Sequence, residues 1–136
     1  MVAVRDQRAR TSRVPSGKAC LVEMEIQSLL PRLRTIVEEM AASPDIWSSS
    51  IRFDLTERHC VRLRQHDGVE VWLICWDLGQ DTLLHDHGGS VGAFAVADGA
   101  LIEDYGALDV PALRTRRHAT GSSVASRISQ LMIERT

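Results

Sequence analysis

The stretch from Leu83 to Gly99 constrains this chain most, because it places two histidines, His85 and His87, one residue apart between apolar neighbours. In an extended segment alternate side chains point to the same face, so the two imidazoles would converge on one point. The Gly88-Gly89-Ser90 bend that follows lets the chain turn back as a second strand. We interpret the pair as metal ligands on a strand. The alternative is a pair of surface polar residues, since His-x-His spacings are common.

Alternating β-branched, aromatic and polar residues from position 51 onward indicate short strands. The runs Cys60–Arg64 and Glu70–Trp76 flank His66-Asp67-Gly68, and Asp-Gly between such runs predicts a β-hairpin. Turn residues separate further candidate strands, which we place at 82–87, 91–97, 100–105 and 112–118. Short strands at this spacing predict an antiparallel barrel or sandwich.

The N-terminal third has a different composition. Residues 1–18 carry five basic side chains against one acid, Asp6, and few large apolar residues, so we predict a disordered basic tail. Apolar residues then recur at helical spacing, and Pro31 is expected to start a second helix. We therefore predict one domain over residues 19–136, with two short helices at about 20–43 covering a β-barrel at about 51–136.

Composition and charge point to small-molecule chemistry. The 136 residues have a formal net charge of −2, which gives no electrostatic reason to expect nucleic acid or an anionic membrane as partner. No apolar run is long enough to span a bilayer and no secretory leader is recognised, so we expect a cytoplasmic protein. We also expect a monomer. The three cysteines, Cys20, Cys60 and Cys75, are widely scattered, which argues against a disulfide framework or a zinc cluster. We expect Cys75 to be a core residue.

The histidine pair also belongs to a longer pattern. Gly79 and Gly99 bracket His85 and His87 at a spacing that resembles the first conserved motif of cupins. The run Trp-Leu-Ile-Cys-Trp at 72–76, followed by His-Asp-His-Gly-Gly-Ser-x-Gly at 85–92, resembles a bacterial cysteine dioxygenase over roughly residues 57–124. This resemblance implies a cupin-type antiparallel β-barrel, or jelly roll, with short N-terminal helices.

The resemblance also implies a reaction. Thiol dioxygenases of this kind hold Fe(2+) with three histidines, bind the substrate thiolate beside O₂, and convert L-cysteine to cysteine sulfinic acid. His85 and His87 match two of the ligands. Arg62, in a context where the family has Tyr-x-Arg, matches the arginine that holds the substrate carboxylate, and a guanidinium offers a bidentate fork for it. Arg64, which we expect on the same face, is a rival. The substrate could instead be 3-mercaptopropionate, which also carries a thiol and a carboxylate.

The chain departs from the family pattern near its last residue. The third histidine belongs to a Val-His-Asp-x-x-Asn motif that would fall at about residues 131–136, where this chain reads Leu-Met-Ile-Glu-Arg-Thr. Codons for these residues can encode His-Asp-Arg in another frame, so we expect a frameshift, with the closing strands of the barrel missing. We expect His118 to be a surface residue of a strand, with the role of substitute ligand as the lesser alternative. The second functional hypothesis is therefore an inactive, metal-poor cupin fragment with a binding role or none.

Overall fold

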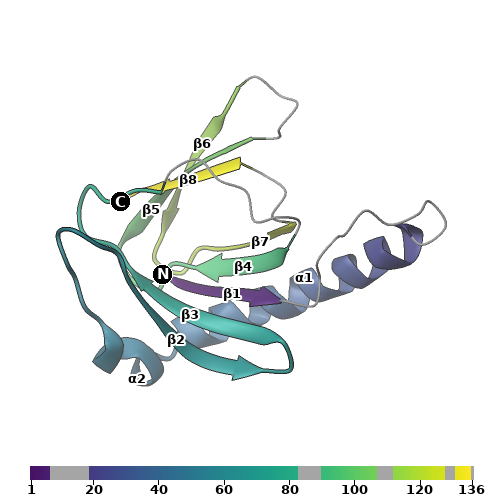
Figure 1. Cartoon of the computed structure of the whole chain (residues 1–136), viewed down its shortest axis with the longest axis horizontal. Helices are drawn as coiled ribbons and strands as arrows, with labels where there is room; N and C mark the ends of the chain where they lie inside the picture. Colours follow the sequence, from purple (N-terminus) through teal and green to yellow (C-terminus); the bar gives the residue numbers. More distant parts are fainter. Residues whose placement is uncertain (7–18, 83–89, 107–111, 128–130, 136) are drawn as a thin grey trace.

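The computed structural model describes residues 1–6, 19–82, 90–106, 112–127 and 131–135. It contains a five-stranded antiparallel sheet in the order β2-β3-β1-β4-β7 and a three-stranded antiparallel sheet in the order β6-β5-β8, with α1 lying along one face of the larger sheet (Figure 1). The elements are β1 (Val2–Asp6), α1 (Ala19–Ala41), α2 (Pro44–Trp47), the 3-10 turn η1 (Ser48–Ser50), β2 (His59–His66), β3 (Val69–Cys75), β4 (Val91–Ala95), β5 (Ala100–Gly106), β6 (Arg114–Ala119), β7 (Ser123–Arg127) and β8 (Leu131–Arg135).

The predicted mainly β, antiparallel architecture is confirmed, although the described strands form two sheets and not one closed barrel. The β2–β3 hairpin turns at Asp67 and Gly68, whose φ angles are 51° and 75°. Aspartate and glycine tolerate this left-handed conformation, and such a turn matches the twist of the two strands. The strands expected at 91–97, 100–105 and 112–118 appear as β4, β5 and β6 with shifted ends. The strand expected at 82–87 lies almost wholly outside the described residues.

The N-terminal segment corrects the sequence prediction. Val2–Asp6 is a strand, β1, in the middle of the five-stranded sheet, where it pairs with β3 on one side and β4 on the other. Val2 and Val4 are buried against α1, so the predicted disordered tail is wrong for residues 2–6. β1 is ordered by its pairing with two neighbouring strands, and the composition of residues 1–18 contains no information on that pairing. Composition therefore gave a wrong prediction for this strand. Residues 7–18 lie outside the described residues.

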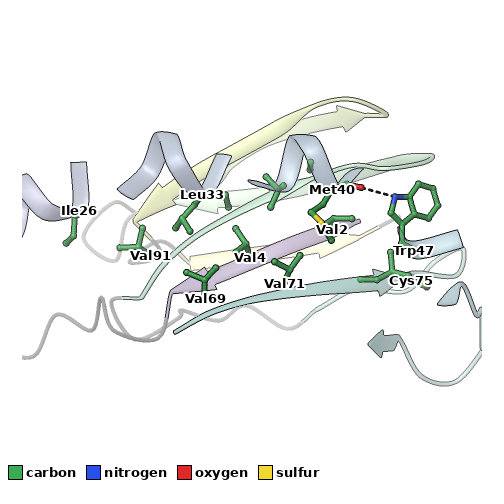
Figure 2. Packing of buried hydrophobic residues seen from close by; sticks show 14 residues of the cluster. Val2, Val4, Ile26, Leu33, Met40, Trp47, Val69, Val71, Cys75 and Val91 are labelled. Atoms are coloured by element: carbon green, nitrogen blue, oxygen red, sulfur yellow. Dashed lines mark hydrogen bonds between the residues drawn. The ribbon is translucent and has the colours of Figure 1, made fainter. Parts of the chain in front are cut away.

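The predicted pair of helices is a single helix. Pro31 lies inside α1, where its ring removes one backbone donor but does not end the helix. Residues on both sides of it, Ile26 and Leu33, are buried against the same sheet, and this packing holds the two halves in line. Figure 2 shows the resulting core between α1 and β1, β3 and β4. Trp47 extends the core, and its indole N–H donates to the Met40 carbonyl oxygen at 3.0 Å.

The face of the five-stranded sheet opposite α1 carries a second apolar cluster, and we call it the inner face. Because side chains alternate along a strand, residues between those of the α1 core point to the inner face. Ile74, Trp76 and Phe94 lie there with Leu101 of β5. Phe94 also contacts His118 of β6 edge to face, with ring centroids 5.2 Å apart, so β6 faces the sheet at this point. None of the helices in the described part of the chain has the length and apolar content needed to cross a bilayer.

Candidate functional site

Arg62, the predicted carboxylate-binding residue, lies on the inner face. It sits in β2 directly opposite Trp72 of β3, and residues directly opposite in an antiparallel pair share a face. Trp72 alternates with Val71 and Leu73, which are buried against α1, so Trp72 and Arg62 point the other way. The Arg62 guanidinium lies 5.8 Å from the Trp72 ring centroid, within the range of a cation–π contact.

Glu70 holds Arg62 in place. The buried Glu70 carboxylate accepts a hydrogen bond from Arg62 Nη1 through Oε1 and one from Arg5 Nη2 through Oε2, each at 3.1 Å. The Glu70 side chain is 5% exposed, whereas those of Arg62 and Arg5 are 48% and 49% exposed. A buried acid therefore fixes one end of each guanidinium, and both guanidinium groups remain half accessible. The sequence analysis missed Glu70 and Arg5, because their grouping with Arg62 depends on a register shift between β2 and β3 and on the pairing of β1 with β3, which alternation alone does not give.

Arg64 does not share this face. The register of β2 against β3 shifts by one residue between Arg62 and Arg64, which is a β-bulge, and Arg64 lies opposite Val71. Val71 packs against α1, so the prediction that Arg64 lies on the same face as Arg62 is wrong. The sequence does not reveal a bulge, because simple alternation assumes a continuous ladder.

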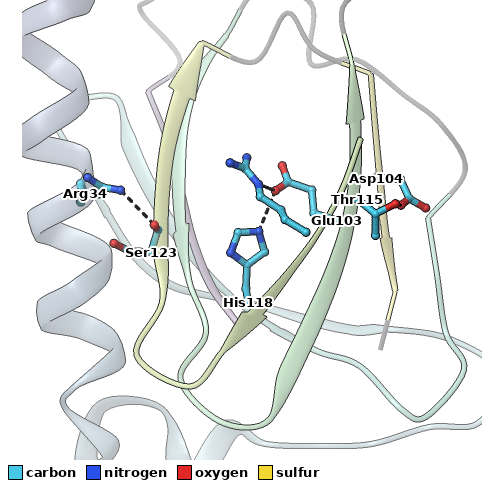
Figure 3. Close-up of polar contacts among 7 residues, drawn as sticks. Arg34, Glu103, Asp104, Thr115, His118 and Ser123 are labelled. Carbon is cyan, nitrogen blue, oxygen red and sulfur yellow. Dashed lines mark hydrogen bonds and ion pairs between the residues drawn. The ribbon is translucent and has the colours of Figure 1, made fainter. Parts of the chain in front are cut away.

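A polar cluster links side chains of the neighbouring strands β5 and β6. The Glu103 Oε2 atom lies 2.8 Å from His118 Nε2 and also accepts a hydrogen bond from Arg116 Nε, and Figure 3 shows the Glu103 and His118 side chains directed toward each other. The Arg116 guanidinium stacks 4.2 Å from the Tyr105 ring centroid. Because His118 is buried, the prediction that it is a surface residue is wrong. Its partner Glu103 lies on β5, the preceding strand. The acidic residues of β5 and the basic residues of β6 were the sequence signal that could have predicted this pairing.

Two buried polar atoms in the interior have no hydrogen-bond partner among the described residues: Glu103 Oε1 and Trp76 Nε1. Buried polar atoms are nearly always paired, so an unpaired carboxylate oxygen marks a place where a donor or a cation would be stabilising. The described residues contain no group of three histidine, cysteine, aspartate or glutamate side chains placed to hold a metal. His85 and His87, the predicted metal ligands, lie outside the described residues.

A cavity of about 400 Å³ opens at the end of the inner face nearest the start of β1. Its walls are mostly apolar and include Met1, Trp47, Phe53, Trp76 and Leu101. Cys75 also lines it and is otherwise buried, as predicted. The cavity provides an apolar space next to the inner face.

The family assignment comes from comparison with known proteins. The family model for cysteine dioxygenase type I matches residues 23–131, which is most of the chain. The chain belongs to the cysteine dioxygenase type I family. A search of curated proteins finds no match. The family is one of thiol dioxygenases, which are metalloenzymes, so membership supports dioxygenase chemistry on a small thiol with O₂.

Proposed function

We propose that this protein is an Fe(2+)-dependent thiol dioxygenase that oxidises L-cysteine with O₂ to cysteine sulfinic acid. The observation that carries the proposal is the position of Arg62 within a chain of this family: a guanidinium on the inner face, fixed at one end by Glu70 and half accessible at the other. In the reaction both oxygen atoms of O₂ are added to sulfur. The thiol supplies all the electrons that reduce O₂, so no further reductant is needed.

His85 and His87 are the proposed metal ligands. Neutral imidazoles are suitable ligands for ferrous iron, and two of them leave coordination positions open. Iron held there would bind both the thiolate and O₂, which turns an encounter of two solutes into a step within one complex. What the chain itself contributes is orientation and exclusion of water. Arg62 orients the substrate through its carboxylate, and the apolar Ile74 and Phe94 cover part of the inner face.

The experiment is oxygen uptake by the chain reconstituted anaerobically with Fe(2+), with L-cysteine, 3-mercaptopropionate and cysteamine as substrates. Cysteine should be consumed with formation of a sulfinate. Cysteamine, which lacks the carboxylate, should react poorly. Faster turnover of 3-mercaptopropionate than of cysteine would reassign the substrate, since both carry the thiol and the carboxylate. Absence of iron-dependent oxygen uptake with all three would contradict the proposed activity.

Arg62→Ala and Arg64→Ala form a matched pair for the carboxylate contact. A charge-assisted contact is worth about 1.5–3 kcal/mol, and a half-exposed guanidinium belongs at the lower end, so the KM for cysteine should rise about tenfold in Arg62→Ala. Arg64→Ala, on the other face, should leave KM unchanged. Equal effects from both variants would contradict the assignment of Arg62.

A further inference from the structure

Glu70 joins two arginines from strands that are far apart in the sequence. Arg5 in β1 and Arg62 in β2 flank β3, and each donates to a different oxygen of the same buried carboxylate. Arg5 lies directly opposite Glu70, which faces the inner side with Trp72, so both guanidinium groups lie on the inner face. The distance between the two donor nitrogens is therefore at most the width of one carboxylate plus the lengths of its two hydrogen bonds.

The charges of this arrangement do not cancel. One glutamate carries one negative charge against the two positive charges of the arginines, so these three side chains together have a net charge of +1. A guanidinium has five N–H donors, and the hydrogen bond to Glu70 uses only one nitrogen of each arginine. A second carboxylate approaching from the accessible side could accept from both arginines and neutralise the remaining charge.

We propose that Arg5 and Arg62 together form a two-arginine subsite for the substrate carboxylate, with Glu70 as the positioning residue for both. This proposal rests on the proposed function, which assigns the carboxylate to Arg62, and extends it to Arg5 and Glu70. Glu70 acts through the arginines: it fixes their orientation before the ligand arrives, so less side-chain entropy is lost on binding. The N-terminal strand is then part of the substrate site as well as of the sheet.

The test compares binding of L-cysteine and cysteamine, which differ only in the carboxylate, to the full metal-free chain by NMR chemical-shift titration under reducing conditions. The wild type should bind cysteine more tightly than cysteamine by roughly tenfold. Arg5→Ala and Arg62→Ala should each reduce that preference by roughly 3- to 10-fold, because each half-exposed guanidinium supplies part of the contact. Arg5→Lys keeps the positive charge but loses the bidentate guanidinium, so it should retain only part of the preference for cysteine. Arg64→Ala, on the opposite face, should leave it unchanged.

Glu70→Gln separates positioning from simple electrostatics. Removal of the glutamate charge makes the inner face more positive, so a purely electrostatic site would bind cysteine more tightly. The positioning role predicts the opposite, a loss of the preference for cysteine over cysteamine. A preference that rises in Glu70→Gln would overturn the role of Glu70. A preference that is unchanged in Arg5→Ala would overturn the two-arginine subsite, and that variant changes a half-exposed side chain, so it does not depend on the behaviour of a core substitution.

The outcomes also separate this proposal from the proposed function. Binding is measured without iron, so a carboxylate preference that depends on Arg5 supports the subsite even if the iron-loaded chain consumes no oxygen. Conversely, oxygen uptake with cysteine that is insensitive to Arg5→Ala, together with an unchanged binding preference, would leave the dioxygenase assignment standing and remove the subsite.

Discussion

Glu103 and His118 face each other across neighbouring strands in the interior, with Oε2 and Nε2 2.8 Å apart and side chains that are 1% and 8% exposed. Glu103 also takes a hydrogen bond from Arg116, so one buried acid holds two basic side chains. Breaking a buried pair by neutralising one member typically costs about 3–5 kcal/mol. Glu103→Gln should therefore lower the free energy of unfolding by about 3 kcal/mol, the lower value because Arg116 is partly exposed.

Urea denaturation of this variant and of Arg117→Gln tests that prediction. Arg117 is an exposed neighbour in β6, and its substitution should change the free energy of unfolding by less than about 0.5 kcal/mol. A Glu103→Gln chain as stable as the wild type would show that the buried cluster does not contribute to stability.

The contact of α1 with the sheet gives a second prediction. Leu33 is fully buried against the strands, so Leu33→Ala should lower the free energy of unfolding by about 3 kcal/mol through lost apolar contact and a residual cavity. Met24 on the same helix is 64% exposed, and Met24→Ala should change the free energy of unfolding by less than about 0.5 kcal/mol. Thermal or urea unfolding followed by circular dichroism measures both. Similar losses in the two variants would contradict the observed orientation of α1.

Cys60 provides a prediction about pH. Desolvation by the surrounding protein raises the pKa of the Cys60 thiol, and the nearby Arg58 partly opposes this by stabilising the thiolate. Because the thiolate is the reactive form, alkylation of Cys60 should need a higher pH than alkylation of an unfolded cysteine. Arg58→Ala should move the midpoint higher still. The rate of iodoacetamide labelling against pH, followed by peptide mass spectrometry, measures the midpoint, and a value below that of the urea-unfolded chain would mean that Arg58 dominates.

Local signals predicted local structure well. Asp67-Gly68 between two alternating runs predicted the β2–β3 hairpin, because the turn needs only the residues that form it. Burial of β1 was not predictable in the same way. Val2 and Val4 are followed by a long basic segment, and only pairing with β3 and β4, distant in the sequence, makes Val2–Asp6 a central strand. The prediction that Pro31 starts a second helix was wrong for a related reason. Packing of α1 on the sheet outweighs the lost backbone hydrogen bond at the proline.

The same distinction between local and long-range signals holds for the residues of the candidate site. The family resemblance identified Arg62 as a candidate, but its position opposite Trp72 and the position of Arg64 on the other face both depend on the bulge in β2, which alternation does not reveal. Alternation within β6 could not predict that His118 is buried, because its burial depends on Glu103, Arg116 and Phe94. A single sequence does not show which strands are neighbours or face one another. Clusters of side chains from several strands therefore cannot be predicted from alternation alone.

The proposed metal ligands can be tested by iron content. His85→Ala and His87→Ala should each abolish Fe(2+) binding, because the loss of one imidazole destroys the chelate. His66→Ala is a matched control, since His66 is an exposed histidine at the β2–β3 hairpin and should leave iron content unchanged. Metal analysis after anaerobic loading and desalting gives the stoichiometry. Wild-type iron content in both His85→Ala and His87→Ala would contradict the assignment.

The most direct test of dioxygenation is isotope labelling with ¹⁸O₂. The iron-loaded chain is incubated with L-cysteine under ¹⁸O₂, and the mass of the sulfinate product is measured. The proposed reaction transfers both atoms of one O₂ molecule to sulfur, so both sulfinate oxygens should carry the label. A product with one or no labelled oxygen, or cystine as the sole product, would contradict the assignment of this chain as a thiol dioxygenase.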